Sequence, residues 1–282
     1  MNIREQSIRN LLVLALVVEA RDPYTGGHLW RVSRYSRMLS EDGGLSPLEV
    51  ARISFGGFLH DLGKIAIPDA ILKKPAPLTE EEFAVIKTHP RVGRRLLTDH
   101  PLERLIESAL YGHHERPDGQ GYPEGLTEDR ILVDAKIVGI CDAFDAMTST
   151  RPYRKGMPIS TALSVIGDNL GTQFDRKWGE RFLELNRVSG LIDHVVGHSE
   201  DGLPLLDCPM CQAPLAISKD KAEGDPVFCR SCGSETFLWN DGTTRGLTPT
   251  GRMGTPSDLE PMVDRSFIKR MVQEFGFLGD SL

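Results

Sequence analysis

The sequence predicts a mainly α-helical protein, with a helical bundle, a small β unit after it and a helix at the C-terminus. Apolar residues recur at helical spacing from the N-terminus to about residue 198. Four cysteines then form two close pairs, as in short β units that a metal ion holds together. Residues 261–277 are again amphipathic at helical spacing. The 282 residues, 40% hydrophobic and 26% charged, are typical of a soluble protein with one or two domains.

The first predicted helix contains the apolar run from Leu11 to Val18, which follows Arg4 and Arg9 and could be taken for a signal peptide. The run is too short to span a bilayer. Glu19 follows at once, and no small-residue cleavage site is evident. We therefore expect a buried helix in a cytoplasmic protein that does not associate with a membrane.

Two later helices begin at capping boxes. Ser46 precedes Pro47 and stands three residues before Glu49, and Thr79 stands three residues before Glu82. Residues 113–130 are rich in glycine, proline and acidic residues and predict an ordered loop between helices. Residues 1–198 are thus expected to form one helical domain.

Residues 207–240 are expected to form the small β unit, after a short linker. The glycine, threonine and proline content of residues 241–260 predicts a flexible linker. For the helix at 261–277, two roles remain open: packing on the main domain, or binding a partner or a second copy of the chain.

The charge of the chain argues against general binding to nucleic acid or anionic lipid. The formal net charge is −7 and the isoelectric point is near 5.7, whereas phosphate binding normally needs a basic surface. In the β unit three basic residues stand against five acidic ones. Contact with a protein is therefore favoured over contact with DNA or RNA, although a nucleic-acid tether remains an alternative.

His60 and Asp61 stand side by side in an otherwise apolar segment. An ionised carboxylate in such a place needs a partner. A single histidine beside a single aspartate most often forms a hydrogen bond within the core. Here, however, further histidines and one more acid lie in segments flanked by apolar helical sequence. Such groups converge inside helical bundles as metal ligands, and imidazole with carboxylate suits iron, manganese, zinc, cobalt or nickel. These further residues are His28, His89, His113, His114 and Asp142.

The motifs together resemble the HD-GYP subgroup of HD-domain metal phosphohydrolases. His60-Asp61 is followed by Gly63-Lys64, by His113-His114-Glu115, by Gly121-Tyr122-Pro123 and by the segment from Asp142 to Lys155, in the order and spacing of that family. The resemblance covers about Glu19 to Phe182. It implies an HD-domain helical bundle that hydrolyses cyclic di-GMP to linear pGpG or GMP with a metal-activated hydroxide at a dinuclear site.

The resemblance also implies the ligands of two divalent ions, with iron or manganese expected. His28, His60 and Asp142 would lie near one ion, His89, His113 and His114 near the other, and Asp61 would bridge them. Some family members use a glutamate four residues before the first ligand histidine for a third ion; this chain has Tyr24 there, so two ions are expected. Asp22 and Thr25 would orient His28, and Asp145 would orient another ligand.

Further residues of the same motifs would act on the substrate. Asp61 and Lys64 are the expected catalytic residues, and Lys64 would reach the scissile phosphate as a compact positive charge. Tyr122, Arg151 and Arg154 would bind substrate with Lys64, the arginines through bidentate hydrogen bonds to phosphate or guanine. The alternatives are a solvated Lys64 and arginines engaged in surface salt bridges.

The cysteines form two CxxC pairs, Cys208 with Cys211 and Cys229 with Cys232. This spacing is typical of a zinc ribbon with a tetrahedral thiolate site. A unit so short cannot bury enough apolar surface alone, so structural zinc should hold its fold. A redox-active dithiol pair is the alternative.

Other functions stay open at this stage. The substrate could be a related cyclic dinucleotide such as 3′,3′-cyclic GMP-AMP, or the protein could bind cyclic di-GMP without hydrolysing it. In the family the Gly-Tyr-Pro loop is linked to contact with diguanylate cyclase (GGDEF) domains. Such a domain, or another signalling protein, is therefore a possible partner through that loop or the ribbon, and a homodimer is also possible.

Overall fold

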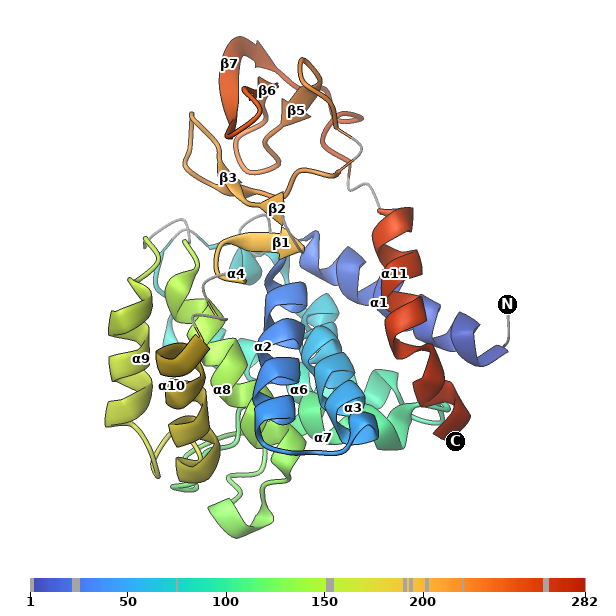
Figure 1. The fold of residues 1–282 in the computed structure, drawn as a ribbon, viewed down its shortest axis with the longest axis vertical. Helices are drawn as coiled ribbons and strands as arrows, with labels where there is room; N and C mark the ends of the chain where they lie inside the picture. The colour runs from blue at the N-terminus through green and yellow to red at the C-terminus, as the bar shows by residue number, and fades with distance from the viewer. Residues whose placement is uncertain are drawn as a thin grey trace.

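The computed structural model describes residues 3–21, 26–74, 76–150, 155–189, 192, 195–200, 203–219, 221–260 and 264–281. Figure 1 shows a helical body, a small β unit stacked on one end of it, and a terminal helix that returns to the body. The prediction of a mainly α-helical protein is confirmed. No helix in the described part of the chain combines the length and apolar character needed to cross a membrane.

The helical body consists of α-helices and short 3-10 helices that follow one another with brief connections. In chain order these are α1 (Ile3–Glu19), α2 (His28–Asp42), α3 (Pro47–Leu59), η1 (Leu62–Ala66), α4 (Asp69–Leu72), α5 (Glu80–Ile86), α6 (His89–Leu96), α7 (Glu103–Gly112), η2 (Glu128–Arg130), α8 (Val133–Thr148), α9 (Ile159–Asp168) and α10 (Arg176–Ser189).

The core of the body lies between α2, α3, α7 and α8. Tyr35 on α2, Phe144 on α8 and Phe182 on α10 are fully buried and meet edge to face, with the rings of Phe144 and Phe182 5.0 Å apart. Such aromatic contacts add to the stabilisation from apolar burial. The apolar face of α1, including Ile8 and Leu12, joins the same core, so the first apolar run is a buried helix as predicted.

Both predicted capping boxes are present. The Ser46 hydroxyl accepts from the Glu49 amide while the Glu49 carboxylate accepts from the Ser46 amide, and Thr79 and Glu82 do the same. Each box satisfies two backbone N–H groups that a helix start otherwise leaves unpaired. These caps fix where α3 and α5 begin.

Short antiparallel sheets make up the β unit. Strands β1 and β2 pair, β3 and β4 pair, and β5, β6 and β7 form one sheet with β6 in the middle. The strands are β1 (His198–Glu200), β2 (Leu203–Pro204), β3 (Leu206–Asp207), β4 (Pro214–Leu215), β5 (Pro226–Phe228), β6 (Ser234–Asn240) and β7 (Arg245–Met253).

The prediction of a flexible linker over residues 241–260 is wrong. Within it β7 pairs with β6 from Ser234 to Asn240, so the third strand of the sheet comes from this segment. Its glycine and proline are compatible with an edge strand. Gly246 leaves room for the ring of Trp239, because a Cβ there would lie 2.2 Å from that ring. The ribbon therefore extends over residues 207–253.

The terminal helix α11 (Arg265–Phe275) packs on the helical body, followed by η4 (Gly276–Ser281). Figure 1 shows α11 beside α1, and the two helices are in contact. Phe275 packs against Phe55 of α3, with ring centroids 4.9 Å apart, and Glu274 pairs with Arg34 and Arg37 of α2, both at 2.9 Å. Of the two roles considered for this helix, packing on the main domain is the one seen in the structure.

We expect Phe275→Ala to destabilise the helical body by about 3–5 kcal/mol, because it removes a fully buried aromatic ring. Phe277→Ala is the matched control, since that ring is 44% exposed and its loss should change stability by less than about 0.5 kcal/mol. Urea unfolding of both variants measures the difference. Equal midpoints for the two variants would show that α11 does not stabilise the body.

Candidate metal centre

Three of the predicted ligands converge from different helices into a first group. His28 begins α2, His60 follows α3 and Asp142 lies on α8. The Nε2 atoms of His28 and His60 are 3.3 Å apart, and Asp142 Oδ1 lies 3.5 Å from the first and 3.7 Å from the second. These three atoms face a common point, as ligands of one ion do.

A second group consists of His89, His113 and His114. His89 begins α6, and the two adjacent histidines follow α7. The Nε2 atoms of His89 and His113 are 3.2 Å apart, and one ligand atom from each residue lies within 4.8 Å of the others. Both groups that the resemblance implies are therefore present among the described residues, and a third set, His60, Asp61 and His113, joins them.

Asp61 lies between the two groups. Its Oδ2 is 3.5 Å from His28 Nε2 and 3.4 Å from His60 Nε2, whereas its Oδ1 is 3.5 Å from His89 Nε2. One carboxylate oxygen thus faces each group. This is the arrangement that a bridging carboxylate requires.

In four of the histidines, the ring nitrogen Nδ1, which is not the one facing the other ligands, has a hydrogen-bond partner. His60 Nδ1 lies 2.7 Å from the Gly57 carbonyl, His89 Nδ1 2.9 Å from that of Ile86, and His113 Nδ1 2.9 Å from that of Ala109. His28 Nδ1 lies 2.8 Å from Asp145 Oδ2. Carbonyl and carboxylate oxygens accept, so Nδ1 carries a proton, and in the neutral imidazole Nε2 then has the lone pair that binds a metal ion. The donor set therefore fits divalent metal ions.

A close backbone approach brings the two groups together. Helix α3 ends at Leu59, so His60 and Asp61 lie at the helix end rather than within a continuing helix, and η1 then turns the chain toward α6. At Gly63 an added Cβ would lie only 1.9 Å from the His89 carbonyl oxygen. Only glycine allows the segment after Asp61 to approach His89 this closely.

The two groups differ in electrostatics. Burial lowers the pKa of His89 to about 4 and that of His114 to about 3, so both are neutral and ready to bind a cation at pH 7. Burial acts in the same direction on His60, but Asp61 and Asp142 raise its pKa to about 10. For Asp61, burial raises the pKa, while Lys64 and His60 bring it well below its usual range. The first group is thus an anionic environment that attracts positive charge.

Lys64 lies beside the bridging position. Its Nζ is 2.6 Å from Asp61 Oδ2, and its side chain is 24% exposed. The ammonium group therefore lies at the edge of the cluster, where it can reach an incoming anion.

A cavity of about 640 Å³ opens beside the second group. His113, His114, Tyr122 and Asp142 line it, and the Tyr122 ring stacks on the His114 ring with centroids 4.6 Å apart. The size falls within the range of small-molecule sites. The site thus combines a metal-binding wall with an aromatic wall.

Glu115 holds the loop that carries Tyr122. Although it is acidic, it is only 8% exposed, and its two carboxylate oxygens accept from the amides of Glu124 and Leu126 at 2.6 and 2.7 Å. The Tyr122 amide donates to the His114 carbonyl at 3.1 Å. The loop is therefore tied to the segment of the two adjacent histidines.

We expect Glu115→Gln to loosen this loop. The amide group offers one oxygen and one NH₂, so one backbone N–H would face a donor and lose its partner, at a cost of about 1–3 kcal/mol. Hydrogen exchange at the Glu124 and Leu126 amides should then speed up, with little change in the exposed control Glu128→Gln. Unchanged protection of both amides would contradict this role for Glu115.

Some predicted residues lie outside the described part of the chain. These are Arg151 and Arg154, expected to bind substrate, and Asp22, Tyr24 and Thr25 of the first motif. The resemblance implies that Asp145 orients a ligand other than His28. In the structure its Oδ2 contacts Nδ1 of His28 itself.

Two contributing arginines were not predicted. The guanidinium of Arg31 holds Asp145 by two hydrogen bonds, at 2.6 and 3.0 Å. Arg21 donates to the carbonyls of Lys64, Ile65 and Ile67. The position of Arg31, three residues after His28 on the same helix, is only a weak indication that it acts near this ligand. Nothing in the sequence relates Arg21 to a segment more than 40 residues away.

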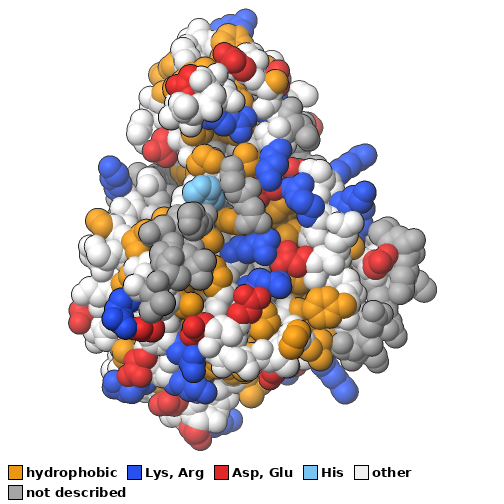
Figure 2. All heavy atoms as spheres, in the orientation of Figure 1, with side chains coloured by type: hydrophobic (Ala, Val, Ile, Leu, Met, Phe, Trp, Pro, Cys, Tyr) orange, Lys and Arg blue, Asp and Glu red, His pale blue; other side chains and the backbone are white. Residues whose placement is uncertain are grey.

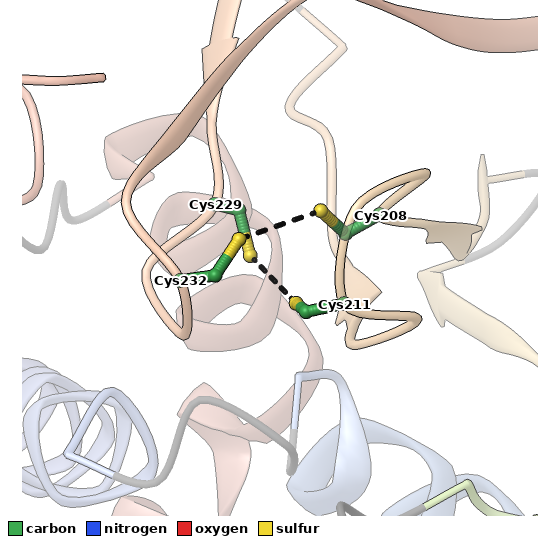
Figure 3. A group of neighbouring side chains, drawn as sticks. All are labelled: Cys208, Cys211, Cys229 and Cys232. Carbon is green, nitrogen blue, oxygen red and sulfur yellow. Dashed lines mark hydrogen bonds between the residues drawn. The ribbon is translucent and has the colours of Figure 1, made fainter. Parts of the chain in front are cut away.

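The four paired cysteines form a separate cluster in the ribbon (Figure 3). Cys208 and Cys232 Sγ are 3.8 Å apart, Cys211 and Cys229 Sγ are 3.5 Å apart, and all four lie within 4.8 Å of one another. A tetrahedral zinc ion with Zn–S bonds of about 2.3 Å requires S···S distances of about 3.8 Å. Ser234 lies near two of the sulfurs, 3.5 Å from Cys208 and 3.1 Å from Cys232. The cluster fits one tetrahedral ion.

Comparison with known proteins gives a family match over the helical body. A family model described as "HD domain" matches residues 13–178. The chain is 42% identical over 194 residues to the cyclic di-GMP phosphodiesterase response regulator RpfG of Xanthomonas campestris pv. campestris, covering 67% of this chain and 51% of that protein. It is 41% identical to a cyclic di-GMP phosphodiesterase of Thermotoga maritima, covering 63% of this chain and 49% of that protein.

A third relative is named for another nucleotide. The 3′3′-cGAMP-specific phosphodiesterase 3 of Vibrio cholerae is 35% identical over 176 residues, covering 62% of this chain and 38% of that protein. The chain thus spans about half the length, or less, of these curated relatives. All three matches are to enzymes named as phosphodiesterases of cyclic dinucleotides.

Proposed function

The chain belongs to the HD domain family, and on this premise we propose that it hydrolyses cyclic di-GMP to linear pGpG or GMP in the bacterial cytoplasm. The observation that carries the proposal is the position of Asp61, with one oxygen toward each of two ligand groups. Two adjacent divalent ions are the usual means of cleaving a phosphodiester. The two relatives with the highest identity cited above bear the name of this activity.

His28, His60 and Asp142 would hold one ion, His89, His113 and His114 the other, and Asp61 both. Iron or manganese suits this mixture of imidazole and carboxylate. When bound, the two ions lower the pKa of a water molecule and stabilise negative charge that develops on the phosphodiester.

The remaining roles belong to side chains at the edge of the site. Lys64 would hold a non-bridging phosphate oxygen, since its ammonium group lies next to Asp61. Tyr122 would bind the substrate from the aromatic wall of the cavity. Arg151 and Arg154 would add bidentate hydrogen bonds to phosphate or guanine.

The ribbon would bind one structural zinc ion through Cys208, Cys211, Cys229 and Cys232. Four thiolates at tetrahedral spacing favour zinc over harder ions. Figure 2 shows basic and acidic side chains interspersed on the face that it draws, which agrees with a role other than nucleic-acid binding. The ribbon or the Tyr122 loop would be the contact for a diguanylate cyclase domain or another signalling protein.

Turnover of cyclic di-GMP by anaerobically purified protein, supplied in turn with iron(II) and manganese(II), tests the proposal. We expect linear product from the native protein and none from the double variant His60→Ala, Asp61→Ala. His100→Ala is the matched control, because this histidine lies outside both ligand groups, and it should keep full activity. Absence of product from the native protein with both ions bound would refute hydrolysis of this nucleotide.

A second candidate substrate is 3′,3′-cyclic GMP-AMP, since the relative of that name is 35% identical. The same assay run with this nucleotide separates the two, because the better substrate shows the higher kcat/KM. Tight binding of cyclic di-GMP without turnover of either nucleotide would instead identify a receptor.

A further inference from the structure

The ribbon and strand β1 contact the chain at two points shortly before the first ligand, His28. Arg230, within the second CxxC pair, donates to the Ala20 carbonyl at 3.0 Å. Strand β1 lies against Gly27, the residue before His28: an added Cβ there would lie 2.6 Å from Ser199 Cα, and Gly27 has a φ of +74°. Figure 1 shows β1 and β2 between the ribbon and the body.

Arg31 connects this contact to a metal ligand. Its side chain is 2% exposed. One nitrogen, Nη1, donates both to the Gly26 carbonyl and to the His198 carbonyl on β1, each at 2.9 Å. The other nitrogens hold Asp145, which in turn meets His28 Nδ1 at 2.8 Å. A continuous set of hydrogen bonds thus runs from β1 to the first ligand.

A second set of contacts leads to the bridging carboxylate. Arg21, next to Ala20, donates to the carbonyls of Lys64, Ile65 and Ile67, in the segment directly after Asp61. The Arg230 contact at Ala20 is therefore one residue from the side chain that fixes this segment.

Glu200 ties β1 to the ribbon and to the terminal helix. It is only 6% exposed, pairs with Arg270 of α11, and lies 3.7 Å from Lys219 Nζ of the ribbon. The position of β1 is thus fixed from the body, the ribbon and α11 together.

We propose that the ribbon with β1 and β2 is a brace for the first ligand group, in which Arg31 and Arg230 are positioning residues. Zinc folds the ribbon, the folded ribbon places Arg230 and β1, and these hold the segments of His28 and Asp61. The ribbon therefore raises the affinity of the site for its catalytic ions. This inference rests on the proposed function only for the identity of the catalytic ions; its test measures metal binding and needs no turnover.

Equilibrium dialysis of the full chain against manganese(II) tests the brace, since bound manganese reports the ligand groups and bound zinc reports the ribbon. Arg31→Lys keeps the charge beside Asp145 but cannot reach all the acceptors. We expect it to weaken manganese binding about 10- to 100-fold, as changes to partners of metal-binding histidines do. Arg230→Ala removes one hydrogen bond and should weaken binding about 2- to 10-fold. Zinc content should stay at one ion per chain in both.

The matched control is Arg252→Ala, a ribbon arginine whose ion pair with Glu235 stays within the ribbon; its manganese affinity should equal that of the native protein. Arg230→Ala also keeps the test valid if Arg31→Lys does not fold. Manganese affinities of Arg230→Ala and any folded Arg31→Lys equal to that of Arg252→Ala would overturn the brace. If these variants bind manganese more weakly and the native protein hydrolyses neither nucleotide, the brace is supported and the proposed function is refuted.

Discussion

Asp61→Asn is expected to lower cyclic di-GMP turnover by more than about 100-fold, and to lower bound manganese from two ions per chain to about one. Changes to partners of metal ligands cost about 10- to 100-fold, and the loss of a bridging ligand should cost more. An amide presents only one oxygen, so it can face one of the two groups, and its NH₂ would face the other. Elemental analysis of the manganese-loaded variant, together with its turnover, measures both effects.

Asp42→Asn is the control for this substitution. Asp42 lies at the surface, where it pairs with Arg181, and its substitution should change neither manganese content nor turnover. If Asp61→Asn retains two manganese ions and native turnover, Asp61 does not bridge the two groups.

Cys229→Ser is expected to abolish zinc binding and to unfold the ribbon. Cys229 is fully buried and is one of the four cysteines of the cluster in Figure 3, and short units of this kind depend on zinc for folding. Limited proteolysis should then cut between residues 207 and 253, while the helical body stays intact. Manganese affinity should also fall, because the brace is lost.

Met210→Ser controls for the change of side chain within the first CxxC pair, since Met210 is 62% exposed. It should keep one zinc ion and resist proteolysis as the native protein does. Retention of zinc and of protease resistance in Cys229→Ser would show that the four cysteines do not form one structural site.

The candidate ligands could be predicted because their chemistry conflicts with their surroundings. His60 and Asp61 stand in an apolar segment, and such polar groups need partners. The helix starts were also predictable, since the capping boxes at Ser46 and Thr79 depend only on residues three positions apart. Features that depend only on residues close together in the sequence can be predicted without knowledge of the fold.

What the sequence did not predict depends on contacts between distant segments. Arg31 meets the His198 carbonyl across 167 positions, and Arg21 reaches Ile67 across 46. The glycine, threonine and proline content of Arg245–Met253 predicts a flexible linker, whereas pairing with β6 makes this segment a strand. Pairing with a partner strand outweighs local propensity there.

The most direct test of the dinuclear site is a manganese titration of protein that has lost its catalytic ions and kept its ribbon zinc. Bound manganese and cyclic di-GMP turnover are measured on the same samples. Since Asp61 faces both ligand groups, turnover should stay near zero up to one bound ion and rise as the second binds. Full turnover with one ion or none, or no turnover with two, would contradict hydrolysis at a two-ion centre.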